Sequence, residues 1–283
     1  MEEKGLINSL IELAFAEDIG DGDHTTLCCI PETEVGSSKL LIKEDGILAG
    51  VEVAIGVFNK LDSDLNIEVF KNDGAHVKMG DIAFTVNGKV QSILQAERIV
   101  LNIMQRMSGI ATITNKYVKL LEGTSAKVLD TRKTTPGMRL LEKQAVKIGG
   151  GVNHRIGLFD MILLKDNHVD FAGGIQNAIK RAKQYLADNN KDLKIEIEVR
   201  SLDELNEALM EGGIDRIMLD NFSPQKTHEA VEIVNGKVEL ESSGGINIDT
   251  IREYALTGVD FISVGALTHS VMSLDMSLKA VEL

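Results

Sequence analysis

The chain has 283 residues, of which 43% are hydrophobic, and this is enough for one large or two ordinary domains with a buried core. Its net charge of −13 and its lack of tryptophan argue against a general nucleic-acid binder, which needs a basic field and stacking platforms. Because no apolar stretch approaches the roughly 18 residues of a membrane span and no secretory signal is present, we expect a cytoplasmic protein with no membrane partner.

The first 121 residues predict a mixed unit of helices and strands. The pattern from 92 to 121 is helical but is interrupted at Ser108–Gly109, where we place a domain boundary. The other expected elements are helices over 5–18 and 51–61, and strands over 37–50, 66–72 and 81–90.

After Gly123 apolar strand patterns alternate with helical patterns. This rhythm predicts a parallel sheet with helical crossovers, as an incomplete, open β/α barrel; an open doubly wound sheet is the alternative. The strand candidates are 127–133, 161–167, 194–201, 215–221, 238–245 and 261–266, and the helical patterns are 173–186, 202–212 and 247–258.

Polar residues end most of these strands, and this favours the barrel. The carboxyl ends of barrel strands carry the reactive groups, so we expect these side chains to meet at one mouth. They are Arg132, Lys133, Lys165, Asp166, Glu198, Asp220 and Ser243, followed by Gly265.

Basic charge is concentrated in one window of this acidic chain. From Lys127 to His168 there are eight Lys or Arg against four Asp or Glu, a local charge of +4. Arginine binds carboxylate or phosphate through a planar fork and lysine binds it as a point charge, although an ion pair with Asp130 would also explain Arg132. His154 alone would more often be structural, but the adjacent Arg155 favours an anion contact.

Lys165 follows an apolar run, where an unpaired charge is costly to bury. It could pair with Asp166, form a Schiff base, or bind substrate as a charge. Glu198 and Asp220 could bind ribose hydroxyls or Mg²⁺, or could pair with the basic residues.

Small residues end the last two strands and are followed by helical patterns, which is typical of a phosphate site. Asp21, Asp23 and His24 look metal-like, but we favour a capped turn. The adjacent Cys28 and Cys29 are interpreted as packing residues in a reducing compartment. The pocket as a whole indicates a small dianionic acid beside a phosphorylated sugar.

Long, ordered motifs along nearly the whole chain resemble the quinolinate phosphoribosyltransferase family, the carboxylating nicotinate-nucleotide pyrophosphorylases. The motifs are "EDIGDGDHTT", "AERIVLNIMQRMSGIAT", "DTRKTTPGMR", "GGGVNHRIGLFDMILLKDNH", "EIEVRSLDEL", "MLDNFSP", "LESSGGI" and "SVGALTHS".

The resemblance implies an N-terminal α/β sandwich domain at 1–109, joined by 270–283, and a barrel domain at 110–269. It implies that quinolinate and phosphoribosyl pyrophosphate give nicotinate mononucleotide, pyrophosphate and CO₂ in de novo NAD biosynthesis, with Mg²⁺. It also implies a homo-oligomer, dimeric or hexameric, in which Arg98 reaches the partner's barrel mouth.

The resemblance also assigns the site residues. Lys165, Glu198 and Asp220 would be catalytic, with the two acids holding Mg²⁺ directly or indirectly, and Arg200 would point away from the mouth. The substrate-binding set would be Arg98, Thr131, Arg132, Lys133, His154, Arg155, Lys165, Glu198, Asp220, Ser243, Gly244, Gly245, Val264, Gly265 and Ala266. The rival interpretations are a paralogue linked to molybdenum transport, a Schiff-base aldolase that uses Lys165, and a non-enzymatic carrier or anion-binding module.

Overall fold

The computed structural model describes residues 3–281, which form two compact units. The first unit contains the chain up to Asn115, then Thr134–Gly150, and the chain from Leu267. The second contains Lys116–Lys133 and Gly151–Ala266. Each unit is described by itself below.

The first unit is built on a four-stranded antiparallel sheet in the order β12-β1-β5-β3. In the centre of the pairing between the last strand and the first, Leu40 lies opposite Leu278, so the C-terminal segment completes this sheet. The strands are β1 (Val35–Ile42), β3 (Asn66–Val69), β5 (Ile82–Lys89) and β12 (Met276–Ala280), and a separate pair joins β2 (Gly46–Ile47) to β4 (His76–Val77).

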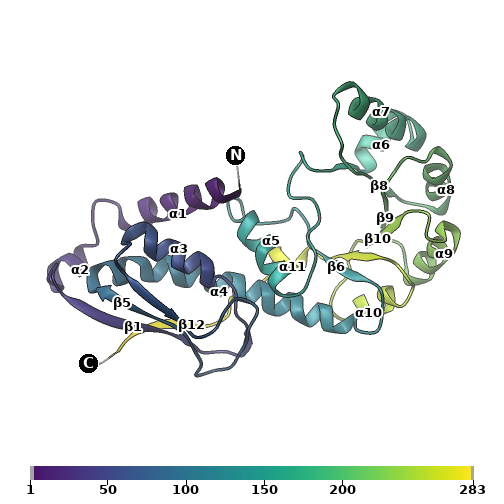
Figure 1. Cartoon of the computed structure of the whole chain (residues 1–283). Coiled ribbons are helices and arrows are strands. Elements are labelled where there is room, and N and C mark those ends of the chain that lie inside the picture. The colour runs from purple at the N-terminus through teal and green to yellow at the C-terminus, as the bar shows by residue number, and fades with distance from the viewer. Residues whose placement is uncertain (1–2, 282–283) are drawn as a thin grey trace. The chain divides into compact units, whose positions relative to one another are not determined.

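Helices pack on this sheet, and Figure 1 shows α1, α3 and α4 on one side of it. An ion pair of 2.7 Å between Lys60 Nζ and Glu12 Oε1 ties α3 to α1. In the core, the rings of Phe58 and Phe84 meet edge to face, with their centroids 6.1 Å apart. The helices are α1 (Glu3–Ile19), α2 (His24–Cys29), α3 (Val51–Leu61), α4 (Val90–Leu120) and α5 (Arg139–Ile148).

The predicted interruption of the helix at Ser108–Gly109 is wrong, because α4 is one continuous helix. The Ser108 hydroxyl donates to the carbonyl of Ala49 at 3.1 Å and accepts from its N–H at 2.9 Å. A Cβ on Gly109 would lie only 2.2 Å from the carbonyl oxygen of Met272. These two small residues therefore serve close packing against the helix and do not end it.

The second unit is a six-stranded parallel sheet in the order β6-β11-β10-β9-β8-β7. From β7 to β11 consecutive strands are neighbours, as in a barrel, and β6 does not pair with β7, so the sheet stays open. All six predicted strands are present, and the predicted open barrel is confirmed. The strands are β6 (Lys127–Leu129), β7 (Ile162–Leu164), β8 (Ile195–Val199), β9 (Arg216–Asp220), β10 (Glu239–Ser243) and β11 (Phe261–Ser263).

Helices connect these strands, and Figure 1 shows α7, α8 and α9 along one face of the sheet. The helix expected over 247–258 is shorter in the structure. The helices are α6 (Asp166–Ala172), α7 (Ile175–Asp188), α8 (Leu202–Glu211), α9 (Pro224–Val234), α10 (Ile251–Ala255) and, at the boundary of the units, α11 (Ala266–His269).

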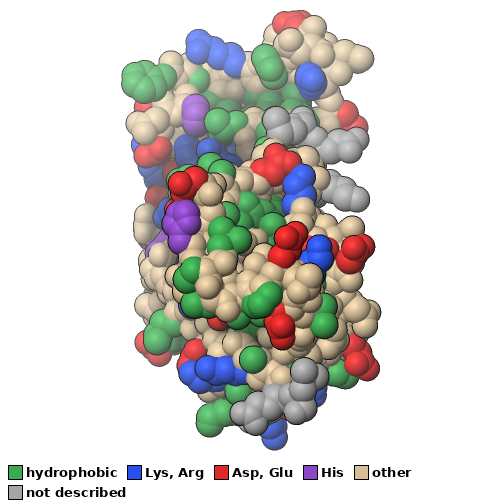
Figure 2. Space-filling view, turned by 90° about the vertical axis from the view of Figure 1, so that its left-hand side faces the viewer, with side chains coloured by type: hydrophobic (Ala, Val, Ile, Leu, Met, Phe, Trp, Pro, Cys, Tyr) green, Lys and Arg blue, Asp and Glu red, His purple; other side chains and the backbone are tan. Residues whose placement is uncertain are grey.

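The surface carries charges of both signs. On the face in Figure 2, acidic and basic side chains are interspersed with apolar ones. Within residues 3–281, no helix is both long and apolar enough to cross a bilayer.

Candidate functional site

A cavity of about 300 Å³ lies in the second unit, at the carboxyl edge of the parallel sheet. It brings together basic residues from three separated segments of the sequence, two of which are predicted strand ends. The predicted strand-end residues Asp166, Glu198, Asp220 and Gly265 are not among its lining. Its lining consists of Thr131, Arg132, Lys133, His154, Arg155, Leu163, Lys165, Met218, Glu241, Ser243 and Ser263.

Arg132 and Arg155 form a strongly basic part of this cavity. The Nε atom of Arg132 is buried and has no hydrogen-bond partner within residues 3–281. Burial, and then repulsion from Arg132, lower the pKa of Arg155, whose Nη1 donates to the carbonyl of Met161 at 3.2 Å. Two guanidinium groups held this close, one with an unused buried donor, make a site that an anion would stabilise.

Lys165 lies beside the two acids of the middle strands. It follows β7 as the N-cap residue of α6, and its Nζ atom is 3.6 Å from Glu198 Oε2. Burial has the largest effect on the pKa of Glu198 and raises it; the charge of Lys165, next in size, lowers it, and the charge of Asp220 raises it again, so that the net shift is upward. Lys165 therefore lies in ion-pair range of Glu198, an arrangement that favours anion binding over a Schiff base.

Glu198 and Asp220 are suited to a hard cation. Their carboxylates are close enough to repel, and Asp220 also accepts a hydrogen bond of 2.9 Å from Asn221 Nδ2. Mg²⁺ prefers one or two such carboxylates together with phosphate oxygens and water. The residues present therefore fit Mg²⁺.

The small-residue turn after β10 is shaped by its backbone. Gly244 has a φ of +102°, and a Cβ there would lie 2.2 Å from Asn221 Oδ1, so only glycine fits. Ser243, before it, lines the cavity.

The turn after β11 is the second predicted phosphate site. The N–H of Val264 donates to the carbonyl of Leu129 at 3.0 Å, and α11, which begins at Ala266, is only four residues long. A helix dipole can therefore contribute little to phosphate binding at this turn.

A buried polar layer lies inside the sheet, and the sequence patterns did not identify it as part of the site. Glu196 on β8 and Glu241 on β10 are fully buried, and Arg216 on β9 is nearly so. Arg216 Nη1 lies 3.3 Å from Glu241 Oε2, and its guanidinium carbon lies 4.0 Å from the centroid of the Phe261 ring. The available signal was the period of two: in "EIEV", "RIMLD" and "ELESS" the polar residues alternate and share one face of each strand.

His154 connects this layer to the cavity. Its Nε2 atom lies 2.9 Å from Glu196 Oε2 and 3.4 Å from Glu241 Oε2. Burial would lower the pKa of His154, but hydrogen bonds to these two carboxylates raise it to about 9. Burial, and then the charge of Glu241, raise the pKa of Glu196 to about 7. The two carboxylates thus favour a proton on Nε2, the ring nitrogen that faces them.

These three residues have the composition of a metal site, with one ligand atom from each within 4.8 Å of the others. The protonation of the histidine argues against this function. The backbone N–H of Arg155 donates to His154 Nδ1 at 2.7 Å, so the ring proton sits on Nε2. A protonated nitrogen cannot coordinate a metal ion.

The remaining predicted residues lie elsewhere. Arg98 is exposed on α4 in the first unit and does not line this cavity. Arg200 points away from the mouth, as predicted, and pairs with Asp170 at 2.9 Å. The capped turn at Asp23 is also confirmed, because its carboxylate accepts the N–H of Thr26 at 3.0 Å at the start of α2.

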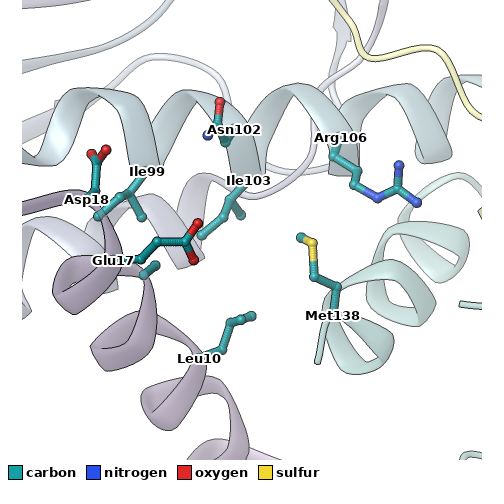
Figure 3. A pocket seen from close by; sticks show the side chains of 9 residues that line it. Leu10, Glu17, Asp18, Ile99, Asn102, Ile103, Arg106 and Met138 are labelled. Carbon is teal, nitrogen blue, oxygen red and sulfur yellow. The ribbon is translucent and has the colours of Figure 1, made fainter. Parts of the chain in front are cut away.

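A second cavity, of about 320 Å³, lies in the first unit (Figure 3). Apolar side chains of α1 and α4 line much of it, and Glu17 and Asp18 lie at the end of α1. Its single basic side chain within the described lining, Arg106, is already bound to Glu142 at 2.7 Å. An apolar and acidic lining is poorly suited to an anion, so the first cavity is the better candidate active site.

Comparison with known proteins agrees with this geometry. The family model for the N-terminal domain of quinolinate phosphoribosyl transferase matches residues 23–108, and the model for its C-terminal domain matches residues 110–279. Among solved structures, NadC from Streptococcus pyogenes is 38% identical with a TM-score of 0.93, covering 100% of this chain and 99% of that one. The nicotinate-nucleotide pyrophosphorylase of Francisella tularensis is 42% identical with a TM-score of 0.91, covering 99% and 98%.

Curated relatives carry related names. The chloroplastic nicotinate-nucleotide pyrophosphorylase (carboxylating) of Arabidopsis thaliana is 45% identical, over 96% of this chain and 82% of that protein. The probable nicotinate-nucleotide pyrophosphorylase (carboxylating) of Bacillus subtilis is 39% identical, over 96% and 92%. The chain therefore belongs to the quinolinate phosphoribosyl transferase family.

Proposed function

We propose that the cavity of the second unit is where this chain performs the reaction of its family. As a member, the chain is a decarboxylating quinolinate phosphoribosyltransferase of NAD biosynthesis. It joins the phosphoribosyl group of phosphoribosyl pyrophosphate to the quinolinate nitrogen and releases pyrophosphate and CO₂.

The observation that carries the placement is the buried, unpartnered Nε of Arg132 among the described residues, in a cavity shared with Arg155 and Lys165. Quinolinate carries two carboxylates on one ring, so it needs several fixed cations, and a guanidinium can bind a carboxylate through two parallel hydrogen bonds. Arg132, Lys133, Arg155 and Lys165 supply that charge. The hydroxyl of Thr131 accepts the backbone N–H of Lys133 at 3.1 Å and so shapes the turn that carries Arg132 and Lys133.

Two acidic residues are proposed to act on the sugar of phosphoribosyl pyrophosphate. Glu198 and Asp220 face developing positive charge at the anomeric carbon as the pyridine nitrogen attacks, and pre-set carboxylates stabilise such charge without reorganisation. Mg²⁺, held by these two residues directly or through water, would neutralise the departing pyrophosphate. Ser243, Gly244, Gly245 and Gly265 are proposed to bind the phosphate groups, with Val264 and Ala266 shaping their turn.

Decarboxylation then follows from the chemistry of the substrate. The alkylated pyridine nitrogen is cationic, so it stabilises the electron pair that stays on C2 when the 2-carboxylate leaves as CO₂. A proton from water then forms the C2–H bond of the product. The protein contributes orientation and charge, which can account for several kcal/mol of the barrier. Lys165 acts as a fixed cation, and no side chain forms a covalent bond with the substrate.

We further propose that the chain works in the cytoplasm as a homodimer or a hexamer, with Arg98 completing the partner's site. The exposed position of Arg98 on α4 supports a contact with another chain. The predicted packing role of Cys28 and Cys29 is wrong, because both side chains are exposed.

An assay of the purified protein tests this function. With quinolinate, phosphoribosyl pyrophosphate and Mg²⁺ we expect equal amounts of nicotinate mononucleotide and CO₂, and we expect both to stop when a chelator removes the cation. The same assay with nicotinic acid in place of quinolinate should release no CO₂. Absence of the mononucleotide at all substrate concentrations would reject the proposal, and borohydride trapping of Lys165 with a carbonyl substrate would favour an aldolase.

A further inference from the structure

The buried acids Glu196 and Glu241 have no place in the proposed chemistry, although Glu241 lines the cavity and Glu196 contacts its lining residue His154. Neither carboxylate is exposed, and each has one oxygen within ion-pair distance of His154 Nε2. Taking a carboxylate out of water costs several kcal/mol, and a buried ion pair is often no more stable than apolar side chains of the same size. Packing alone therefore gives little reason for acids at these two positions.

Both acids converge on one side chain, His154, from two strands. Glu196 lies on β8 and Glu241 on β10, and both face Nε2 of the ring, at 2.9 and 3.4 Å. Arg216, on β9 between them, balances their charge through Glu241 at 3.3 Å. Charged side chains of three neighbouring strands thereby surround Nε2 of the imidazole.

The other side of the ring is also engaged. Nδ1 accepts the backbone N–H of Arg155 at 2.7 Å, and the backbone N–H of His154 donates to Asp130 Oδ1 at 2.9 Å. Both ring nitrogens are thus occupied by protein groups. Because Nε2 faces these two acids, we expect the ring to act mainly through Arg155, whereas the resemblance implies a direct contact with quinolinate.

We propose that Glu196 and Glu241 are positioning residues that hold His154 and, through Nδ1 of its ring, the main chain at Arg155, so that the Arg155 guanidinium faces the acid. The inference rests on the proposed function for the identity of that acid. The chain segment after Arg155 is fixed independently, because Asp160 accepts the N–H groups of Ile156 and Gly157 at 2.7 and 2.8 Å. The ring is the link between this loop and the sheet.

Substitution of Glu196 gives the test. Glu196→Leu removes the acceptor for Nε2–H, whereas Glu196→Gln keeps a carbonyl oxygen there and removes the charge. Glu239→Gln is the matched control, since Glu239 is the first residue of β10 and its partly exposed side chain pairs with Arg216 at 3.0 Å. All three variants are compared with wild type by circular dichroism and thermal unfolding.

For Glu196→Leu we expect the quinolinate KM to rise by about 10- to 100-fold, the range found when hydrogen-bond partners of metal-binding imidazoles are removed. The KM for phosphoribosyl pyrophosphate should change by less than about twofold, because the acids act on the quinolinate side. Glu196→Gln should recover most of the loss, and Glu239→Gln should behave as wild type. Equal changes in both KM values, or a Gln variant as impaired as the Leu variant, would overturn the inference.

A second readout needs no turnover. In ¹⁵N spectra of the substrate-free protein, assigned with a His154→Asn variant, the wild-type ring should show a protonated Nε2 and a hydrogen-bonded Nδ1. Both signals should shift in Glu196→Leu and stay in place in Glu239→Gln. Unshifted signals in Glu196→Leu would reject the positioning role. Failure of wild type to make the mononucleotide would instead reject the proposed function, so the two failures are distinguishable.

Discussion

The guanidinium of Arg132 is the side chain on which the proposed acid site depends most directly. Its Nε is buried in the cavity with no hydrogen-bond partner in the described chain, and an unmet buried donor costs about 1–3 kcal/mol. A carboxylate ligand would satisfy this donor. The binding energy of quinolinate therefore includes the relief of a penalty that the free protein already carries.

Replacement of Arg132 should accordingly remove most activity. For Arg132→Ala we expect kcat/KM for quinolinate to fall by at least about 100-fold, the scale of losing one partner of a buried charge pair. The control is Arg200→Ala, which removes an exposed arginine that pairs with Asp170 outside the cavity. Wild-type turnover by a folded Arg132→Ala protein would exclude Arg132 from the site.

Glu198 should show a conflict between stability and function. Burial and the neighbouring Asp220 raise its pKa above 4.5, so the folded state disfavours the ionised form. The folded protein is therefore penalised above the raised pKa, and the penalty disappears as the pH falls below the unfolded value. This is the opposite of the usual behaviour of a surface carboxylate in an ion pair.

For Glu198→Gln we expect the free energy of unfolding near neutral pH to rise by on the order of 1 kcal/mol, while activity falls sharply. The gain should shrink toward pH 4, where the native carboxyl is itself protonated. Denaturant unfolding of both proteins across this pH range gives the comparison. An equal gain at both ends of the range would show that charge is not its cause.

The long helix α4 shows how a local pattern can mislead about a whole element. A glycine after a serine predicts a break, because glycine lowers helix stability by about 1 kcal/mol relative to alanine. The structure keeps the helix, since Gly109 lets the main chain at Met272 approach closely. Tertiary packing overrides the intrinsic preference at this position.

Two glycine substitutions separate these effects. Gly109→Ala should lower the free energy of unfolding by about 1–3 kcal/mol through overpacking against Met272. Gly56→Ala, in α3, meets no atom within 4 Å and should raise it by roughly 0.5–1 kcal/mol through helix propensity alone. Chemical denaturation measures both. Stabilisation by Gly109→Ala would mean that the contact is looser than the structure shows.

For the whole molecule, the position of Arg98 makes the assembly a part of the proposed function. It is exposed on α4 in the first unit and is not among the residues that line the cavity of the second unit. If each site needs Arg98 from another chain, two inactive variants can complement each other.

Chains that carry Arg98→Ala and chains that carry Lys165→Ala should each be nearly inactive alone. In a two-fold dimer, random pairing of equal amounts should restore about one quarter of wild-type activity, because half the dimers are mixed and each has one complete site. The subunits are mixed under denaturing conditions, refolded and assayed. A mixture no more active than its components would show that Arg98 does not act across chains.

The sequence alone was enough to predict the fold of the second unit and part of the candidate site. The alternation of apolar strand and helix patterns predicts the six parallel strands, because buried strands and amphipathic helices have different periods. Polar residues at strand ends predict a shared mouth, because parallel strands end at one edge, and Arg132, Arg155 and Lys165 do line one cavity there.

Only the tertiary structure decided which groups His154 contacts and that Gly109 lets the main chain at Met272 approach closely. It also decided that Glu196 and Glu241 lie beside His154. The physical reason is that these roles depend on partners far away in the sequence, at distances of about 3 Å that a local pattern does not contain. A glutamate that alternates with isoleucine looks the same whether it faces solvent or a buried imidazole. The role of such a glutamate is decided only when folding brings Arg216 and His154 close to it.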